Sequence, residues 1–70
     1  MSMATQGSHF WFMVIAMPGG NVGSYQGTIT PRPGATRLDM FNQVREDVRR
    51  HAPATTAGAV TAFDVQPNQL

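Results

Sequence analysis

The chain has 70 residues, with five arginines, no lysine, four acidic residues and a formal net charge of +1. This near balance excludes the strong electrostatic field that draws a protein to nucleic acid or to an anionic membrane. The chain contains no cysteine, which excludes disulfides and thiolate metal sites, and its two histidines are too few for a closed zinc site. A domain of this size buries only about 60% of the surface of its unfolded chain, so we expect oligomerisation to add stability.

The first predicted strand covers residues 9–17 and holds an unbroken apolar run from residue 10 to residue 17. Residues 1–8 before it are small and polar, which predicts a flexible N-terminal segment ahead of a single domain over residues 9–70. Side chains alternate between the two faces of a strand, so both faces of this strand need cover. One face carries Phe10, Phe12, Val14 and Ala16, and the other carries Trp11, Met13, Ile15 and Met17.

The apolar run is much shorter than the roughly 20 residues that cross a bilayer. It also lacks the basic residues that precede the apolar core of a signal peptide, because the first arginine of the chain is Arg32. We therefore expect a soluble cytoplasmic protein that makes no contact with a membrane.

Residues 18–21 have the composition of a tight turn, and residues 22–30 form the second predicted strand. Its two faces differ. Tyr25 and Ile29 share one face with two glycines, and the opposite face is polar, with Ser24, Gln26, Thr28 and Thr30. A weak, half-polar strand of this kind suits the edge of a sheet.

A helix is predicted over residues 37–52, with Thr36 as its N-cap and Pro53 as its stop. Its expected apolar stripe consists of Leu38, Phe41, Val44, Val48 and Ala52. On the exposed side, Glu46 and Arg50 have the spacing of a favourable ion pair. Residues 54–58 then read as a loop of small residues.

The third predicted strand covers residues 59–66, with Phe63 and Val65 on the same face as Thr61. Asp64 points the other way, where it either faces water or pairs with an arginine; we expect water. The order ββαβ predicts a small α+β domain with a three-stranded sheet in the order 2-1-3 and one helix on one face.

One helix covers one face of a three-stranded sheet, so the other face is left open. That open face carries either Trp11 and its companions or their alternates along the first strand. We assign an interaction surface to Trp11, Met13, Ile15, Met17 and Tyr25. A homodimer, formed face to face or through an edge strand, is the expected assembly, and a different, unidentified protein is the other partner considered.

We find no catalytic motif, so we expect no enzyme, no cofactor and no metal site. Four arginines give the helix a basic flank, which sets the alternative hypothesis of a small nucleic-acid-binding regulator. That alternative assigns the nucleic-acid contacts to Arg37, Arg45, Arg49 and Arg50. Nearby acidic residues dilute this charge, so nucleic acid is the less favoured partner.

Residues 27–37 followed by Asp39 form one stretch, and the C-terminal residues 63–70 form another. Both stretches resemble short proteins of actinomycetes and their phages. The first stretch contains the sequence TPRPGATRLD, and the second contains PNQL. The resemblance covers residues 9–70. It implies no activity and no site residue, since no activity is known for that group.

Overall fold

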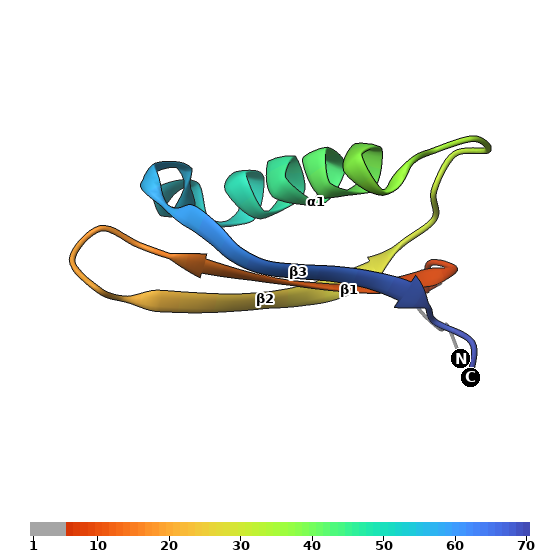
Figure 1. The fold of residues 1–70 in the computed structure, drawn as a ribbon, viewed down its shortest axis with the longest axis horizontal. Helices are drawn as coiled ribbons and strands as arrows, with labels where there is room; N and C mark the ends of the chain where they lie inside the picture. Colours follow the sequence, from red (N-terminus) through yellow and green to blue (C-terminus); the bar gives the residue numbers. More distant parts are fainter. Residues whose placement is uncertain (1–5) are drawn as a thin grey trace, which may run out of the picture.

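The computed structural model describes residues 6–70 and has one helix lying along one face of a three-stranded sheet (Figure 1). The central strand β1 pairs antiparallel with both of its neighbours, in the order β2-β1-β3. The α+β fold and the strand order predicted from the sequence are therefore confirmed. The elements are β1 (His9–Ala16), β2 (Val22–Ile29), α1 (Arg37–His51), the 3-10 helix η1 (Pro53–Ala57) and β3 (Ala59–Pro67).

Two turns are built from glycines with positive φ. Between β1 and β2, Gly19 and Gly20 have φ of 91° and 95°, and the turn is closed by a 2.7 Å hydrogen bond from Met17 N to Asn21 O. Before α1, Gly34 follows a proline and has φ of 81°, and Ala35 N donates to Arg32 O. Proline followed by a positive-φ glycine is the pattern of a type II turn. Both turns therefore depend on glycine for backbone geometry.

A capping box starts α1. The Thr36 hydroxyl accepts a hydrogen bond from Asp39 N, and Asp39 Oδ2 accepts one from Thr36 N at 3.0 Å. The hydrogen bonds from Thr36 hold the pKa of Asp39 below its ordinary value of 3.8. The same carboxylate lies in the first turn of the helix, where the dipole favours an anion.

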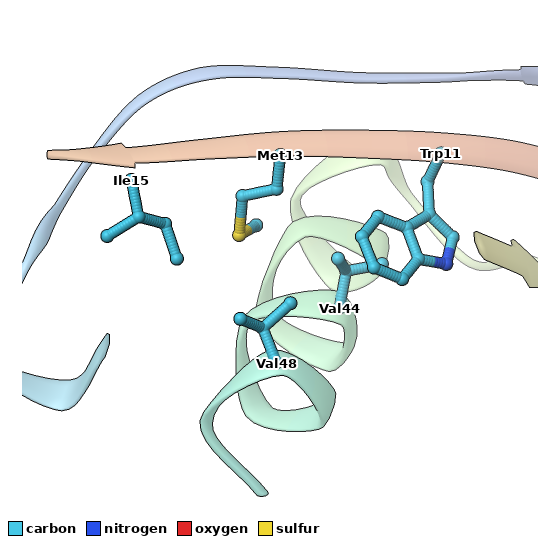
Figure 2. Packing of buried hydrophobic residues seen from close by; sticks show 5 residues of the cluster. All are labelled: Trp11, Met13, Ile15, Val44 and Val48. Carbon is cyan, nitrogen blue, oxygen red and sulfur yellow. The ribbon is translucent and has the colours of Figure 1, made fainter. Parts of the chain in front are cut away.

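The core lies between β1 and α1, where Trp11, Met13 and Ile15 point toward Val44 and Val48 (Figure 2). Met13, Ile15 and Val44 are completely buried. The helix also packs on β3, where the Phe41 and Phe63 rings meet edge to face with centroids 5.3 Å apart.

The buried face of α1 differs from the predicted stripe. Val44 and Val48 are buried as expected, but Met40 joins them and Leu38 is 66% exposed. Around a helix with 3.6 residues per turn, Met40 lies about 40° from Val44, whereas Leu38 lies about 120° away. The helix is therefore centred on Val44, and the prediction for Leu38 was wrong.

The segment predicted as a loop after α1 is the 3-10 helix η1, which Arg45 holds against α1. The guanidinium donates to Thr55 O at 2.6 Å, to Thr55 Oγ1 at 3.3 Å and to Gly58 O at 3.3 Å. Thr55 is buried, and its hydroxyl donates to Ala52 O. Polar groups that would otherwise be buried without partners are thus satisfied, which stabilises the segment.

A bulge in β3 changes which residues share a face. The register of β3 against β1 shifts between Val14 and Ile15, because Val14 pairs with Ala62 and Ile15 pairs with Val60. Thr61 is the extra residue. Val60 therefore packs on the core together with Phe63 and Val65, in place of Thr61, which is exposed.

The predicted flexible segment over residues 1–8 lies in part outside the described residues. Within the described part, Gly7 N donates to Thr28 Oγ1, and Ser8 N donates to Thr30 Oγ1. Asn68 N donates to Ser8 O, so these residues are held against the ends of β2 and β3. Over residues 6–70, no helix is both long and apolar enough to cross a membrane.

Candidate functional site

The sheet has an open face opposite α1, and aromatic side chains lie at its centre. Phe10 and Phe12 are 38% and 37% exposed, which is high for two aromatic residues of a central strand. Val14 and Ala16 continue the same face and are half-buried. We call these four residues the β1 stripe. None of the elements described for residues 6–70 covers it (Figure 1).

The structure corrects the sequence-based choice of face. Trp11, Met13 and Ile15 were expected on the open face, but they are 7%, 0% and 0% exposed beneath α1 (Figure 2). Met17 and Tyr25 are half-buried and pack against the same core. These side chains face the helix because it covers their side of β1, so the alternate residues of the strand form the open face.

Polar residues of the outer strands flank the β1 stripe. On β2, Thr28, Gln26 and Ser24 pair in register with Phe10, Phe12 and Val14, respectively. On β3, Gln66 and Asp64 pair with Phe10 and Phe12. An apolar centre with a polar rim is the arrangement typical of protein–protein interfaces.

The rim on β3 is held by a network centred on Asp64. Arg37 Nη2 lies 3.1 Å from Asp64 Oδ1, and Gln66 Nε2 donates to both carboxylate oxygens. The Arg37 guanidinium also lies 5.8 Å from the Phe63 ring centroid. Hydrogen bonds from Gln66 and then Arg37 hold the pKa of Asp64 below its ordinary value of 3.8. The expectation that Asp64 simply faces water was therefore wrong.

The two edges of the sheet differ in how they are protected. Edge strands that carry charge, proline or a bulge are protected against pairing with another chain. The β3 edge has all three, in Asp64, Pro67 and the extra residue Thr61. The β2 edge runs over Val22–Ile29 with no charged residue and no proline. It is the less protected of the two.

A small hollow of about 230 Å³ lies between α1 and β2 and is lined by two of the predicted site residues, Trp11 and Tyr25. Two of its polar lining residues already have partners: Asp47 pairs with Arg50 at 3.1 Å, and His51 Nδ1 donates to the Asp47 carbonyl at 2.9 Å. The full lining consists of Trp11, Tyr25, Gln26, Asp47, Val48 and His51.

All four arginines of the alternative site have intramolecular partners. Arg37 pairs with Asp64, and Arg45 holds η1. Arg49 pairs with Glu46 at 2.6 Å and Arg50 pairs with Asp47. The predicted pair between Glu46 and Arg50 is replaced by these two i,i+3 pairs. The basic flank is thus largely neutralised by its own neighbours.

The described residues bring together few groups that could do chemistry. No cluster of three His, Asp or Glu residues within residues 6–70 has the spacing of a metal site. Ser8 Oγ and His9 Nδ1 are 2.8 Å apart, but they are chain neighbours at the start of β1, where Ser8 is exposed and His9 is half-buried. No acidic residue orients this histidine in the hydrogen bonds of that part of the chain, so the described contacts form a Ser–His pair without the third group of a catalytic triad.

Comparisons with protein families, with curated proteins and with solved structures found no match to this chain. The resemblance to short actinomycete and phage proteins therefore stays a prediction.

Proposed function

We propose that the protein is a non-catalytic interaction module that associates with a second copy of itself through the open face of its sheet. The observation that carries the proposal is the exposure of Phe10 and Phe12 side by side on a face with no covering element in residues 6–70. Fully burying an aromatic side chain contributes roughly 1.5–3 kcal/mol, and covering the exposed part of each phenylalanine contributes a fraction of that.

The size of this face favours a weak, reversible dimer. Three strands spaced about 4.8 Å apart, with eight residues rising about 3.4 Å each, form a face of roughly 14 Å by 27 Å. Two such faces bury less than the roughly 1,200 Å² that marks the low end of stable specific interfaces. We therefore expect a dissociation constant in the micromolar range.

The charge distribution supports a protein partner over a nucleic acid. Asp64 is the only ionisable side chain of the open face within the described strands, and the arginines of the helix are paired with acids or with η1. A nucleic-acid interface needs cations free to contact phosphates. We propose the cytoplasm as the site of action, because a cysteine-free chain suits a reducing compartment.

The proposal is tested by the molar mass in solution of the wild type and of two variants. In Phe12→Gln, a polar side chain replaces the centre of the β1 stripe, and we expect dimerisation to weaken about tenfold or more. In Leu38→Gln, a residue that is 66% exposed on the helix is changed in the same way, and we expect no effect.

A wild type that stays monomeric at high concentration would overturn the proposal. Equal weakening by both variants would also overturn it, because the open face would then not be the contact surface. Association that survives Phe12→Gln unweakened would also overturn the proposal, and would direct the search for the contact to the less protected β2 edge.

A further inference from the structure

The side chains of the open face differ in size from one end of β1 to the other. Along β1, the side chains decrease from Phe10 and Phe12 to Val14 and Ala16. The neighbouring strand β3 follows the same trend. Gln66 and Asp64 on β3 pair with the phenylalanines, whereas Ala62 and Ala59 pair with Val14 and Ala16. Along β1 and β3 the face is therefore bulky at one end and shallow at the other.

We infer that the two copies pack with their β1 strands antiparallel, around a twofold axis that crosses the strands near Met13. This inference rests on the proposed self-association and specifies its geometry. In this arrangement Phe10 lies over Ala16 of the second copy, and Phe12 lies over Val14. Each large side chain of β1 then meets a small one, which keeps the two sheets evenly spaced and fills the interface.

In the opposite arrangement the two β1 strands are parallel, and each side chain of the stripe lies over the same side chain of the second copy. Phe10 would then meet Phe10 at one end, and Ala16 would meet Ala16 at the other. Two flat sheets pack about 10 Å apart, so an interface filled at one end only would leave a gap at the other. Unfilled space forfeits dispersion contacts, which weakens the parallel arrangement.

The polar rim is compatible with the antiparallel arrangement. On β2, Gln26 pairs with Phe12 and Ser24 pairs with Val14, so the antiparallel arrangement places Gln26 over Ser24 of the second copy. An amide and a hydroxyl can exchange a hydrogen bond there. On β3, Asp64 lies over Ala62 of the second copy, so the two Asp64 carboxylates are not opposed.

The cysteine-free sequence allows the geometry to be measured with single-cysteine variants and a short thiol-to-thiol cross-linker. Val22 pairs with Ala16 and Thr28 pairs with Phe10, at opposite ends of β2. We expect a mixture of Val22→Cys and Thr28→Cys to form covalent dimers. We expect Ala16→Cys alone to form none, because its two copies lie at opposite ends of the interface.

Three results would overturn the inferred geometry. Cross-linking of Ala16→Cys to itself would overturn the antiparallel geometry while leaving self-association intact. A dimer by molar mass in which neither experiment yields a covalent product would overturn it as well. A monomeric wild type would remove the proposed function, and the inferred geometry with it.

Discussion

The Trp11 indole lies over Gly27, its partner in the register of β1 and β2. A Cβ atom at Gly27 would lie 3.0 Å from Trp11 Cζ2 and 3.2 Å from Cε2, closer than ordinary van der Waals contact. The absence of a side chain at Gly27 thus makes room for the largest residue of the core.

Gly27→Ala is therefore expected to destabilise the fold by about 1 kcal/mol, because the added methyl group forces the indole from its position. An alanine that fitted without strain would instead stabilise the chain slightly, through the lower entropy of its unfolded state. Denaturant unfolding, followed by the fluorescence of the single tryptophan, measures the difference. Ser24→Ala, at an exposed position of the same strand, is the control. A Gly27→Ala protein as stable as the wild type would contradict the contact.

Val44→Ala and Leu38→Ala test the observed orientation of α1. Val44 is fully buried, so its truncation leaves a cavity and is expected to cost about 2 kcal/mol. Leu38 is mostly exposed, so its truncation is expected to change stability by less than about 0.5 kcal/mol. Both values come from denaturant unfolding at concentrations low enough to keep the chain monomeric. A loss of stability from Leu38→Ala well above about 0.5 kcal/mol would indicate that Leu38 lies on the buried face of the helix, as the sequence predicted.

Arg45→Met should destabilise the segment that follows α1 by about 1–2 kcal/mol, because the Thr55 and Gly58 carbonyls lose their donor. Arg45→Lys should recover only part of this loss, since an ammonium lacks the planar fork that reaches three acceptors. Arg49→Met, which removes an exposed ion pair, is the control. Hydrogen exchange at Thr55 N, which donates to Ala52 O, reports the local effect. Equal stability of the wild type and Arg45→Met would contradict the role of this arginine.

Acid should weaken the fold through Asp39 and Asp64, whose pKa values are both lowered by hydrogen bonds in the native state. A group with a lowered native pKa contributes stability above its ordinary value of 3.8. That contribution disappears as the pH falls through the native pKa. Unfolding midpoints of the wild type and of Asp39→Asn with Asp64→Asn, measured from neutral pH to about pH 2, test this. If the double variant loses as much stability in acid as the wild type does, other groups are responsible for the acid sensitivity.

The sequence predicted the start of α1 and of each strand because these depend on local signals, and it predicted the strand order because the crossover rule leaves one place for β3. The apolar run of β1, the Thr36 cap and the stop at Pro53 each act within a few residues. The bulge at Thr61 was missed because it arises from the pairing of β3 with β1, which only the assembled sheet defines.

The candidate surface was assigned to the wrong face of β1, although the sequence carried a signal for the correct one. In the antiparallel register, the polar residues of β2 share a face with Phe12, and its glycines share a face with Trp11. A polar row indicates the side that faces water, and the glycines indicate the side that must accommodate an indole and a helix. Average hydrophobicity cannot distinguish the two faces, because both are apolar along β1.

The partner of Asp64 was also beyond the reach of the sequence pattern. Arg37 is 27 residues away in the chain, and the two meet only because the start of α1 lies beside β3. Ion pairs of this separation follow from the tertiary arrangement and leave no periodic trace in the sequence.

Association through the open face is tested most directly by a dilution series that follows the backbone amide signals of the isotopically labelled wild type. We expect the signals of Phe10, Phe12 and Val14 to shift together with concentration along a single binding curve. The indole N–H signal of Trp11 should stay constant, because that ring is buried within its own chain. Signals that do not change with concentration, or changes confined to α1 or to the β2 edge, would contradict association through the open face.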